Sequence, residues 1–379
     1  MPGHAYQENH LCFHQKQLGH DVWVITSDRP ASKFRSSQED GYAPGIYKDR
    51  DVPIIRLPCL VEIKQHGQVM LRGLIGQVIN LKPDVIHSHG IWSFHTQQIM
   101  YSIVPKVCKL FVDDHADGRN IRLDLPSRRF WIWFFKRTLL PTMKHKVSRF
   151  IAVNPFSQWH LRHNLGIPEN RIAFLPLGVN DDSYYPDPRR RKQIRAQLRI
   201  LDDEVVFFTG AGFDSTKALD ILIKAFAEVA SQNSSVRLVV IGSGPREYVD
   251  TLKQLCRDLG LGERVIFTGW VEPAELPAYY NAGDVAVMPG KISTTKDSLG
   301  VGVPLIVSRE KASEYLIAHG NGMAFEPGDI HGLATIMRSY AESLLLRAQH
   351  GIKSLELVRT SLSWRRIAER SIAIYTGVD

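Results

Sequence analysis

A regular alternation of short apolar runs with helical segments, repeated twice along the 379 residues, constrains the fold more than any other feature of this chain. In the first half, apolar runs of strand length occupy 22–26, 52–57, 83–89, 109–115 and 149–154. In the second half, the same design returns at 204–210, 236–242, 264–269, 285–288 and 303–307. Buried strands that alternate with helices predict a parallel sheet with helices on both faces. The sequence therefore predicts two doubly wound α/β domains.

Residues 181–204 separate the two series and differ from them in composition. The stretch 181–192 reads DDSYYPDPRRRK, and a polar, proline-bearing sequence of this kind is typical of an inter-domain linker. We therefore expect an N-terminal domain over 1–185, a C-terminal domain over 186–360 and a final helix over 361–379. The basic run 189–192 fits the solvated face of a linker helix, with nucleic-acid binding as the alternative. We expect no nucleic-acid partner.

The N-terminal region lacks one expected element. Residues 1–9 read as a polar loop, a helix follows as far as Gly19, and no apolar run precedes them. A doubly wound domain ordinarily begins with a strand, so we expect either that the natural start lies upstream of Met1 or that another segment covers the gap. The remaining expectations are a long exposed loop over 28–51, a helix over 70–81 and a single helix over 331–349.

Composition and charge narrow the class of protein. Hydrophobic residues make up 44% of the chain and charged residues 23%, which is ordinary for a globular protein, and no apolar run is long enough to span a bilayer. The four cysteines are scattered without a C-x-x-C pair, which favours reduced thiols in a cytoplasmic protein. The net charge of +8 indicates an anionic partner such as a nucleotide, a phospholipid or a nucleic acid.

The stretch 285–308 is the strongest candidate for a working centre. The apolar run 285–288 ends at Pro289 and Gly290, and a second run begins at Val303. Hydroxyl side chains stand between them at Ser293, Thr294 and Thr295. A short helix that starts there would direct its free N–H groups and positive dipole end at a phosphate or pyrophosphate. Asp297, in the first turn, would bind a sugar diol or only complement the dipole.

Short motifs also recur in a fixed order along both halves. They are Gly3 ahead of the helix with Gln7, VIHSHG at 85–90, IAVNPFS at 151–157, VIGSGP at 240–245, VIFTGW at 265–270, YYNAGD at 279–284 and GVP at 302–304. This ordered set resembles the large family of retaining glycosyltransferases with GT-B architecture that is usually numbered family four. The resemblance covers nearly the whole chain. It implies two Rossmann-like domains that face each other across a cleft, with a C-terminal helix that crosses back to the N-terminal domain.

The resemblance also implies roles for individual residues. A nucleoside-diphosphate sugar would bind the C-terminal domain, where Lys217 would contact the diphosphate and Asp297 the ribose. His115 would contact the transferred sugar near C6. The alternatives are a solvated lysine at 217 and, at 115, a strand-end histidine that is bonded to Asp113 or Asp114 or packed in the core. Further donor contacts are implied for Gly212, Gly242, Gly244, Gly269, Trp270, Val271, Pro289, Gly290, Ile292, Ser293, Thr294 and Thr295, and acceptor-side contacts for Gly3, His4, Gln7 and His89.

Three departures from the family pattern concern the same site. Glycine stands at 212, where a second cation is usual, and the first glutamate of the family's acidic pair has no counterpart because the loop 289–293 is short. Gly300 lies inside the predicted helix, at a cost of ~1 kcal/mol against alanine. The expected activity is transfer of a hexose to a glycan, a lipid-linked or a small-molecule acceptor. The alternative is a nucleotide-sugar-binding protein of this fold that has lost turnover.

The histidines His87, His89 and His95 raise the question of a metal. Spacings of two and six on a strand and its loop do not close a tetrahedral zinc site. We therefore expect no metal and no cofactor besides the nucleotide-sugar co-substrate.

Residues 130–150 have the most unusual composition, because aromatic side chains are interleaved with lysine and arginine. This pattern suits an interfacial segment on an anionic membrane surface. It suits equally a helix whose aromatics fill the core while its basic face is solvated. The first interpretation predicts a protein that is peripheral on the inner face of a membrane.

Overall fold

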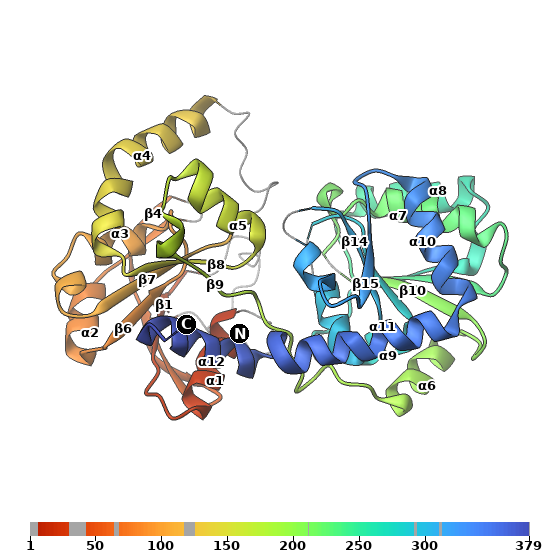
Figure 1. Cartoon of the computed structure of the whole chain (residues 1–379), viewed down its shortest axis with the longest axis horizontal. Helices are drawn as coiled ribbons and strands as arrows, with labels where there is room; N and C mark the ends of the chain where they lie inside the picture. Colours follow the sequence, from red (N-terminus) through yellow and green to blue (C-terminus); the bar gives the residue numbers. More distant parts are fainter. Residues whose placement is uncertain are drawn as a thin grey trace. The chain divides into compact units, whose positions relative to one another are not determined.

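The computed structural model describes residues 7–29, 43–63, 68–116, 126–210, 212–291, 294–310 and 313–378. The chain forms two compact units, both visible in Figure 1. The N-terminal unit contains 6–177 and 367–379, and the C-terminal unit contains 178–366. The changes of unit therefore lie at Leu177/Gly178 and Arg366/Ile367, several residues from the positions 185 and 360 that composition indicated.

The largest sheet of the N-terminal unit is parallel, as the alternation predicts, whereas β2 and the β4–β5 pair add antiparallel strands. One sheet has the order β6-β7-β8-β9, and all its pairs are parallel. A second sheet has the order β1-β3-β2, and a hairpin joins β4 to β5. The bounds are β1 (Val24–Ser27), β2 (Gly45–Asp49), β3 (Val52–Leu57), β4 (Cys59–Ile63), β5 (Gln68–Leu71), β6 (Val85–Ser88), β7 (Lys109–Asp114), β8 (Arg149–Ala152) and β9 (Ile172–Phe174).

Two expectations for this unit are wrong. The predicted loop 28–51 contains β2, which pairs antiparallel with β3. The predicted helix 70–81 begins only at Leu74, because Gln68–Leu71 form β5. The four residues 45–48 of β2 are all exposed, so this edge strand carries no buried alternation that periodicity could reveal.

The helices of the N-terminal unit are α1 (Gln7–Gln17), α2 (Leu74–Leu81), α3 (Phe94–Met100), η4 (Val104–Lys106), α4 (Pro126–Lys146), α5 (Pro155–Trp159), the π-turn η5 (His160–Asn164), η6 (Glu169–Arg171) and α12 (Trp364–Thr376). Pro155 is at the first position of α5, as predicted, and Asn154 closes a capping box with Ser157. The C-terminal part of α12 packs on this unit, because Ser371 accepts a hydrogen bond from Gln15 at 2.8 Å.

The C-terminal unit holds a six-stranded parallel sheet in the order β12-β11-β10-β13-β14-β15. The strands are β10 (Val205–Gly210), β11 (Val236–Ile241), β12 (Val265–Gly269), β13 (Val285–Met288), β14 (Leu305–Ser308) and β15 (Gly322–Phe325). The chain order reverses between β10 and β13. In open parallel sheets, ligands bind outside the carboxyl ends of the strands at this switch point.

Helices cover both faces of that sheet. One hydrophobic core contains side chains of α7, α8 and α10, and the other contains side chains of α9, η9 and α11. The bounds are α6 (Pro188–Gln197), η7 (Ser215–Lys217), α7 (Leu219–Ala230), α8 (Arg246–Asp258), η8 (Gly262–Arg264), α9 (Leu276–Ala282), η9 (Thr294–Val301), η10 (Glu314–Ile317), α10 (Ile330–Glu342), α11 (Leu344–Leu357) and the π-turn η11 (Val358–Leu362).

Two further expectations are corrected in this unit. The single helix predicted over 331–349 is two helices, because Ser343 separates α10 from α11. Its side chain caps α11 by accepting a hydrogen bond from the Leu346 amide at 3.1 Å. The basic run 189–192 is only partly solvated, because Arg191 bonds Asp284 at 2.7 Å, whereas Arg189 and Lys192 are exposed. Later in α6, Arg195 is 2% exposed and bonds Asp284 at 3.3 Å and the carbonyl of Leu201 at 2.6 Å. The helix therefore belongs to the C-terminal unit rather than to a free linker.

The four cysteines carry free thiols. Cys256 is buried, whereas Cys12, Cys59 and Cys108 are partly buried. Burial, helped by the charge of Glu8, raises the pKa of Cys12 to about 12, and burial raises the pKa of Cys256 to about 11. Thiols in this state are protonated at neutral pH and react slowly.

Candidate functional site

The carboxyl end of β10 holds the beginning of the helix that the sequence analysis singled out. The helix is a 3-10 helix, η9, and it begins at Thr294. The buried hydroxyl of Thr295 donates to the Gly210 carbonyl at 2.8 Å and accepts from the Gly210 amide at 3.0 Å. These two hydrogen bonds to the last residue of β10 place the helix start at the switch point of the sheet.

A second connection brings two lysines to the same edge. Lys217 ends the 3-10 helix η7, whose N-cap is Asp214. The backbone amide of Lys291, just beyond β13, donates to the carbonyl of Thr216 at 3.0 Å. Partial burial opposes ionisation of Asp214, but hydrogen bonds from Thr216 and the charges of Lys217 and Lys291 lower the pKa of this carboxyl. Both ammonium groups therefore act on one small region at the end of the sheet.

The predicted glycine loops lie at the ends of β11 and β12. The amide of Gly242 donates to the carbonyl of Gly269 at 3.0 Å, which joins the two strand ends. A Cβ at Gly244 would lie 2.5 Å from the backbone oxygen of Phe213, so only glycine fits there. Val271 is buried, and Trp270 is 59% exposed. The indole of Trp270 thus presents an open aromatic face next to these loops.

Asp297 lies in η9 and is 4% exposed. Its Oδ1 accepts from the ammonium of Lys296 at 2.9 Å, and the same ammonium donates to the carbonyl of Gly178. Burial first, and then the charge of Asp297, raises the pKa of the hydroxyls of Tyr184 and Tyr315. The structure therefore shows Asp297 in a buried ion pair, and its predicted contact with a ribose stays a prediction.

Packing, and not helix propensity, explains why a glycine stands at position 300. A Cβ at this position would lie 2.5 Å from the carbonyl oxygen of Tyr184 and 3.2 Å from Val179. The glycine in η9 is therefore a packing requirement rather than a weakness of the helix.

The remaining predicted donor-site and acceptor-site residues are described only in part. Gly3, His4, Ile292 and Ser293 lie outside the residues that the structure describes, and only the backbone of Thr294 is described. Pro289 and Gly290 are described and buried at the end of β13. Gly212 is described and exposed, and a Cβ there would meet no atom within 4 Å.

The predicted residues of the N-terminal unit gather around one buried carboxylate. Asp113, at the end of β7, is fully buried. Its Oδ2 lies 2.6 Å from Nδ1 of His89 and 3.1 Å from Nε2 of His115, and its Oδ1 accepts from the Gly90 amide at 2.7 Å. Asp113 thus holds both predicted histidines at the carboxyl ends of β6 and β7. Of the two alternatives for His115, the structure shows a bond to Asp113 together with a side chain that is 41% exposed.

The charges of this cluster follow from burial and from Asp113. Burial disfavours the charged form of His89, but the carboxylate of Asp113 outweighs it and raises the pKa of His89 to about 9. The same balance raises the pKa of His115, and despite complete burial the histidines lower the pKa of Asp113 well below its usual range. Burial, together with the charge of Asp113, raises the pKa of Asp114 to about 7. The pKa is therefore lowered for Asp113 but raised for Asp114, although the two residues are adjacent on one strand.

The grouping that could hold a metal ion differs from the one that spacing excluded. Among the described residues, His87, His89 and Asp113 have ligand atoms within 4.8 Å of one another. His95 instead places Nε2 3.0 Å from the His89 carbonyl. His87 Nδ1 contacts the Tyr375 hydroxyl at 2.7 Å, whereas its buried Nε2 lies 3.4 Å from Asp113 Oδ2 and makes no hydrogen bond among the described residues.

Gln7 and Glu8 complete this side of the N-terminal unit. Gln7 is 6% exposed, and its amide finds no hydrogen-bond partner among the residues that the structure covers. A carboxylate oxygen of Glu8 lies 3.9 Å from Nδ1 of His89, and its charge helps to raise the pKa of His89 and His115. Sequence reasoning gave Glu8 no role, because its partner is eighty residues away.

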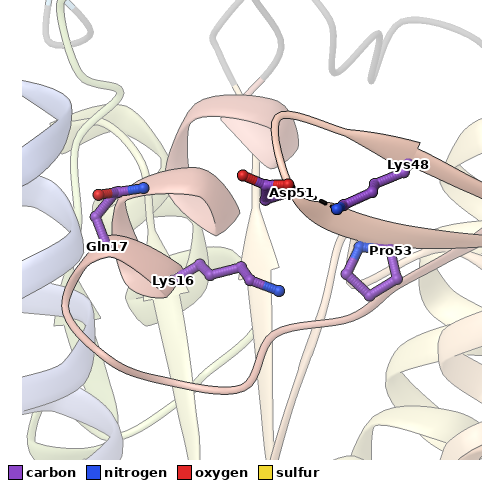
Figure 2. A pocket seen from close by; sticks show the side chains of 5 residues that line it. All are labelled: Lys16, Gln17, Lys48, Asp51 and Pro53. Atoms are coloured by element: carbon purple, nitrogen blue, oxygen red, sulfur yellow. Dashed lines mark ion pairs between the residues drawn. The ribbon is translucent and has the colours of Figure 1, made fainter.

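A hollow of 530 Å³ on the N-terminal unit lies apart from these residues. It is lined by Lys16, Gln17, Lys48, Asp51 and Pro53, as Figure 2 shows. Lys48 and Asp51 form an ion pair of 2.6 Å across it. None of the predicted site residues lines this hollow.

Comparison with known families places both halves of the chain. Residues 9–183 match the family model described as Glycosyltransferase Family 4. Residues 203–343 match the model described as Glycosyl transferases group 1. The chain belongs to the group 1 glycosyltransferases. The resemblance found in the sequence is therefore confirmed for the family.

Curated relatives and solved structures agree with this assignment. The chain is 26% identical over 222 residues to a GDP-mannose-dependent alpha-(1-6)-phosphatidylinositol monomannoside mannosyltransferase of Mycolicibacterium smegmatis, a match that covers 55% of this chain and 57% of that protein. It is 24% identical over 238 residues to a mannosylfructose-phosphate synthase of Agrobacterium fabrum, covering 60% and 52%. These matches span little more than half the length of each relative.

Two solved structures share the GT-B fold over almost the full chain. Sucrose-phosphate synthase from Thermosynechococcus elongatus aligns with a TM-score of 0.73 at 20% identity, over 97% of this chain and 91% of that one. HepE of Anabaena, solved in complex with UDP, aligns with a TM-score of 0.70 at 18% identity, over 94% and 100%. The predicted fold class is thereby confirmed.

Proposed function

We propose that this protein is a retaining hexosyltransferase that moves a sugar from a nucleoside-diphosphate donor to a glycan, a lipid-linked or a small-molecule acceptor. One observation carries the proposal. The switch point of the C-terminal sheet combines the start of η9, bonded to Gly210 through Thr295, with Lys217 at the end of η7. Amide N–H groups and a cation at this edge suit a diphosphate leaving group, whose negative charge grows as the sugar departs.

The roles of the other residues follow from this placement. Trp270 and the joined loops at Gly242 and Gly269 would line the nucleotide, with Trp270 presenting its exposed ring. His115, fixed by Asp113, would bind the transferred sugar. Asp297 would reach a ribose only by exchanging its bond from Lys296, so we place it as the floor of the nucleotide site. Because cations and amides neutralise the diphosphate, the reaction needs no metal.

Donor turnover tests the proposal. GDP-mannose and UDP-glucose are suitable donors, because the relatives and neighbours named above use GDP-mannose or bind UDP. The donor that raises the melting temperature should be hydrolysed slowly without an acceptor, and Lys217→Ala should abolish the release of nucleoside diphosphate. Lys253→Ala, an exposed lysine on α8, is the matched control. Stabilisation by a donor without any release would instead support the alternative, a binding protein that has lost turnover.

We also propose that α4 attaches the protein to anionic lipid. Both interpretations of its sequence are partly realised, because Phe135 and Met143 are buried whereas Phe130 is 63% and Trp133 is 57% exposed. Exposed Lys136 and Arg137 accompany the aromatic pair. No helix in the described ranges is long and apolar enough to cross a bilayer, so attachment would be interfacial.

Vesicle sedimentation tests the attachment. Binding to vesicles that contain anionic lipid should weaken as the salt concentration rises, and Phe130→Ser with Trp133→Ser should reduce it further. Trp23→Ser, which removes an exposed tryptophan elsewhere in the N-terminal unit, should leave binding unchanged. Equal partition of the wild type to neutral and anionic vesicles would count against the proposal.

A further inference from the structure

The loop after β13 contains a cation that the sequence analysis left without a role. Lys291 is the first residue after Pro289 and Gly290, and it is only partly buried. Its amide is fixed to the Thr216 carbonyl at 3.0 Å, so its position is tied to η7 rather than to its own strand. The next residue of η7 after Thr216 is Lys217. Two ammonium side chains therefore start from adjacent anchored backbone positions.

The carboxylate of Asp214 interacts with the charges of both lysines. Asp214 accepts a hydrogen bond from the Thr216 amide at 2.8 Å and is the N-cap of η7. Its carboxyl experiences the positive charges of Lys217 and Lys291 together. A diphosphate carries more negative charge than one carboxylate, so a ligand at this edge would attract the pair more strongly than Asp214 does.

The third element of the argument is Gly212. It lies between the last residue of β10 and Asp214, and a Cβ there would meet no atom within 4 Å. Its φ is not in the left-handed region, so a side chain at this position would not strain the backbone. The β10 loop thus has room for a Cβ at Gly212 but carries no cation there.

We infer that Lys291 is the second cation of the diphosphate site and that it does the work a basic residue at position 212 would do. This inference rests on the proposed function. Lys291 and Lys217 would approach the diphosphate from two loops, those after β13 and β10. The inference identifies Lys291 as a contact to the leaving group that was not among the residues predicted from sequence.

The test uses diphosphate binding, which does not depend on turnover. Calorimetric titration of the full chain with GDP and with UDP should give an affinity that Lys291→Ala weakens on the order of 10-fold to 100-fold, the range for a lost charge-assisted contact. The salt dependence of the remaining affinity should also be shallower. Lys253→Ala is the control for a general loss of positive charge, and equal melting temperatures without ligand show that the variants are folded.

Rescue makes the test specific. Adding Gly212→Arg to Lys291→Ala should restore most of the affinity, because the new guanidinium enters the open space beside the same site. Wild-type affinity in Lys291→Ala, or a double variant no better than the single one, would overturn the inference. A wild type that binds neither diphosphate would overturn it together with the proposed function. Binding without turnover would overturn only the transferase proposal. The role of Lys291 would still be decided by the affinity measurements.

Discussion

Replacement of Asp113 by asparagine offers a sharp test of the electrostatics of the N-terminal unit. The substitution keeps the shape of the side chain but removes the charge that His89 and His115 face at 2.6 Å and 3.1 Å. In the wild type, Asp113 raises the pKa of His89 to about 9 against burial, whereas an unfolded histidine titrates near 6.5. This rise in the pKa of His89 corresponds to about 3 kcal/mol of stability, at about 1.36 kcal/mol for each pH unit.

The sign of the pH dependence follows from the raised pKa. Protonated His89 stabilises the folded state fully below about pH 6.5, and this contribution disappears as the pH rises through about 9. Asp113 is ionised throughout this range, because its pKa is well below its usual value. Asp113→Asn should therefore be destabilised by about 3 kcal/mol at about pH 6, and this deficit should shrink towards about pH 10.

Urea unfolding followed by tryptophan fluorescence measures this difference. All the seven tryptophans except Trp270 and Trp364 belong to the N-terminal unit, so the signal reports mainly the unit that carries the substitution. The midpoint of Asp113→Asn relative to the wild type should rise steadily between about pH 6 and about pH 10. A deficit that is independent of pH would refute the assignment of a shared charge to Asp113 and His89.

The neighbouring residue supplies a matched control. Asp114 is 3% exposed, and burial raises its pKa to about 7. Ionisation of a buried acid whose pKa is raised costs stability, so Asp114→Asn should stabilise the protein relative to the wild type above about pH 7. This gain should not change with pH in the way that the deficit of Asp113→Asn does. The two isosteric substitutions on one strand should thus change stability in opposite directions.

Three further predictions concern the C-terminal unit and the need for metal. Gly300→Ala should destabilise the protein by about 1–3 kcal/mol in urea, although helix propensity alone predicts a gain, because its Cβ would lie 2.5 Å from the Tyr184 carbonyl. Arg195→Met should lower the free energy of unfolding by about 1–3 kcal/mol, since the carbonyls of Leu201 and Glu204 lose their donor, while Arg191 still holds Asp284 at 2.7 Å. Exhaustive chelation should leave donor turnover unchanged, because lysines and amides supply the positive charge. A loss that zinc or magnesium restores would contradict this.

The strands of the C-terminal sheet were predictable from sequence because this sheet is parallel and buried on both faces, and Val285–Met288 coincides with its predicted run. Val52–Leu57 also coincides with its predicted run, although one of its neighbours is antiparallel. Gly45–Asp49 was missed because it is an exposed edge strand that owes its conformation to hydrogen bonds with β3. The break at Ser343 was hidden because apolar periodicity continues across it into α11.

The site was predictable only where one segment carries the signal. Thr294 begins η9 as the hydroxyl cluster indicated. Lys291 and Asp113 gain their importance from partners on other segments, Thr216 in one case and His89 in the other. Lys296 reads as an ordinary surface lysine, yet it is buried against Asp297. Contacts between distant segments of this kind leave no periodic pattern in one sequence.

In both units a carboxylate at the end of a strand or loop sets the position of cations, and this arrangement has a consequence for pH. The charges of two lysines lower the pKa of Asp214, whereas Asp113 faces His89, whose charge is lost as the pH rises through about 9. Donor binding by the C-terminal unit should therefore be nearly constant from about pH 6 to about pH 9. Any step that needs protonated His115 should persist to a higher pH than it would with an ordinary histidine and then decline, because Asp113 outweighs burial and raises the pKa of His115. A fall in turnover at constant donor affinity would locate the pH-sensitive step in the N-terminal unit.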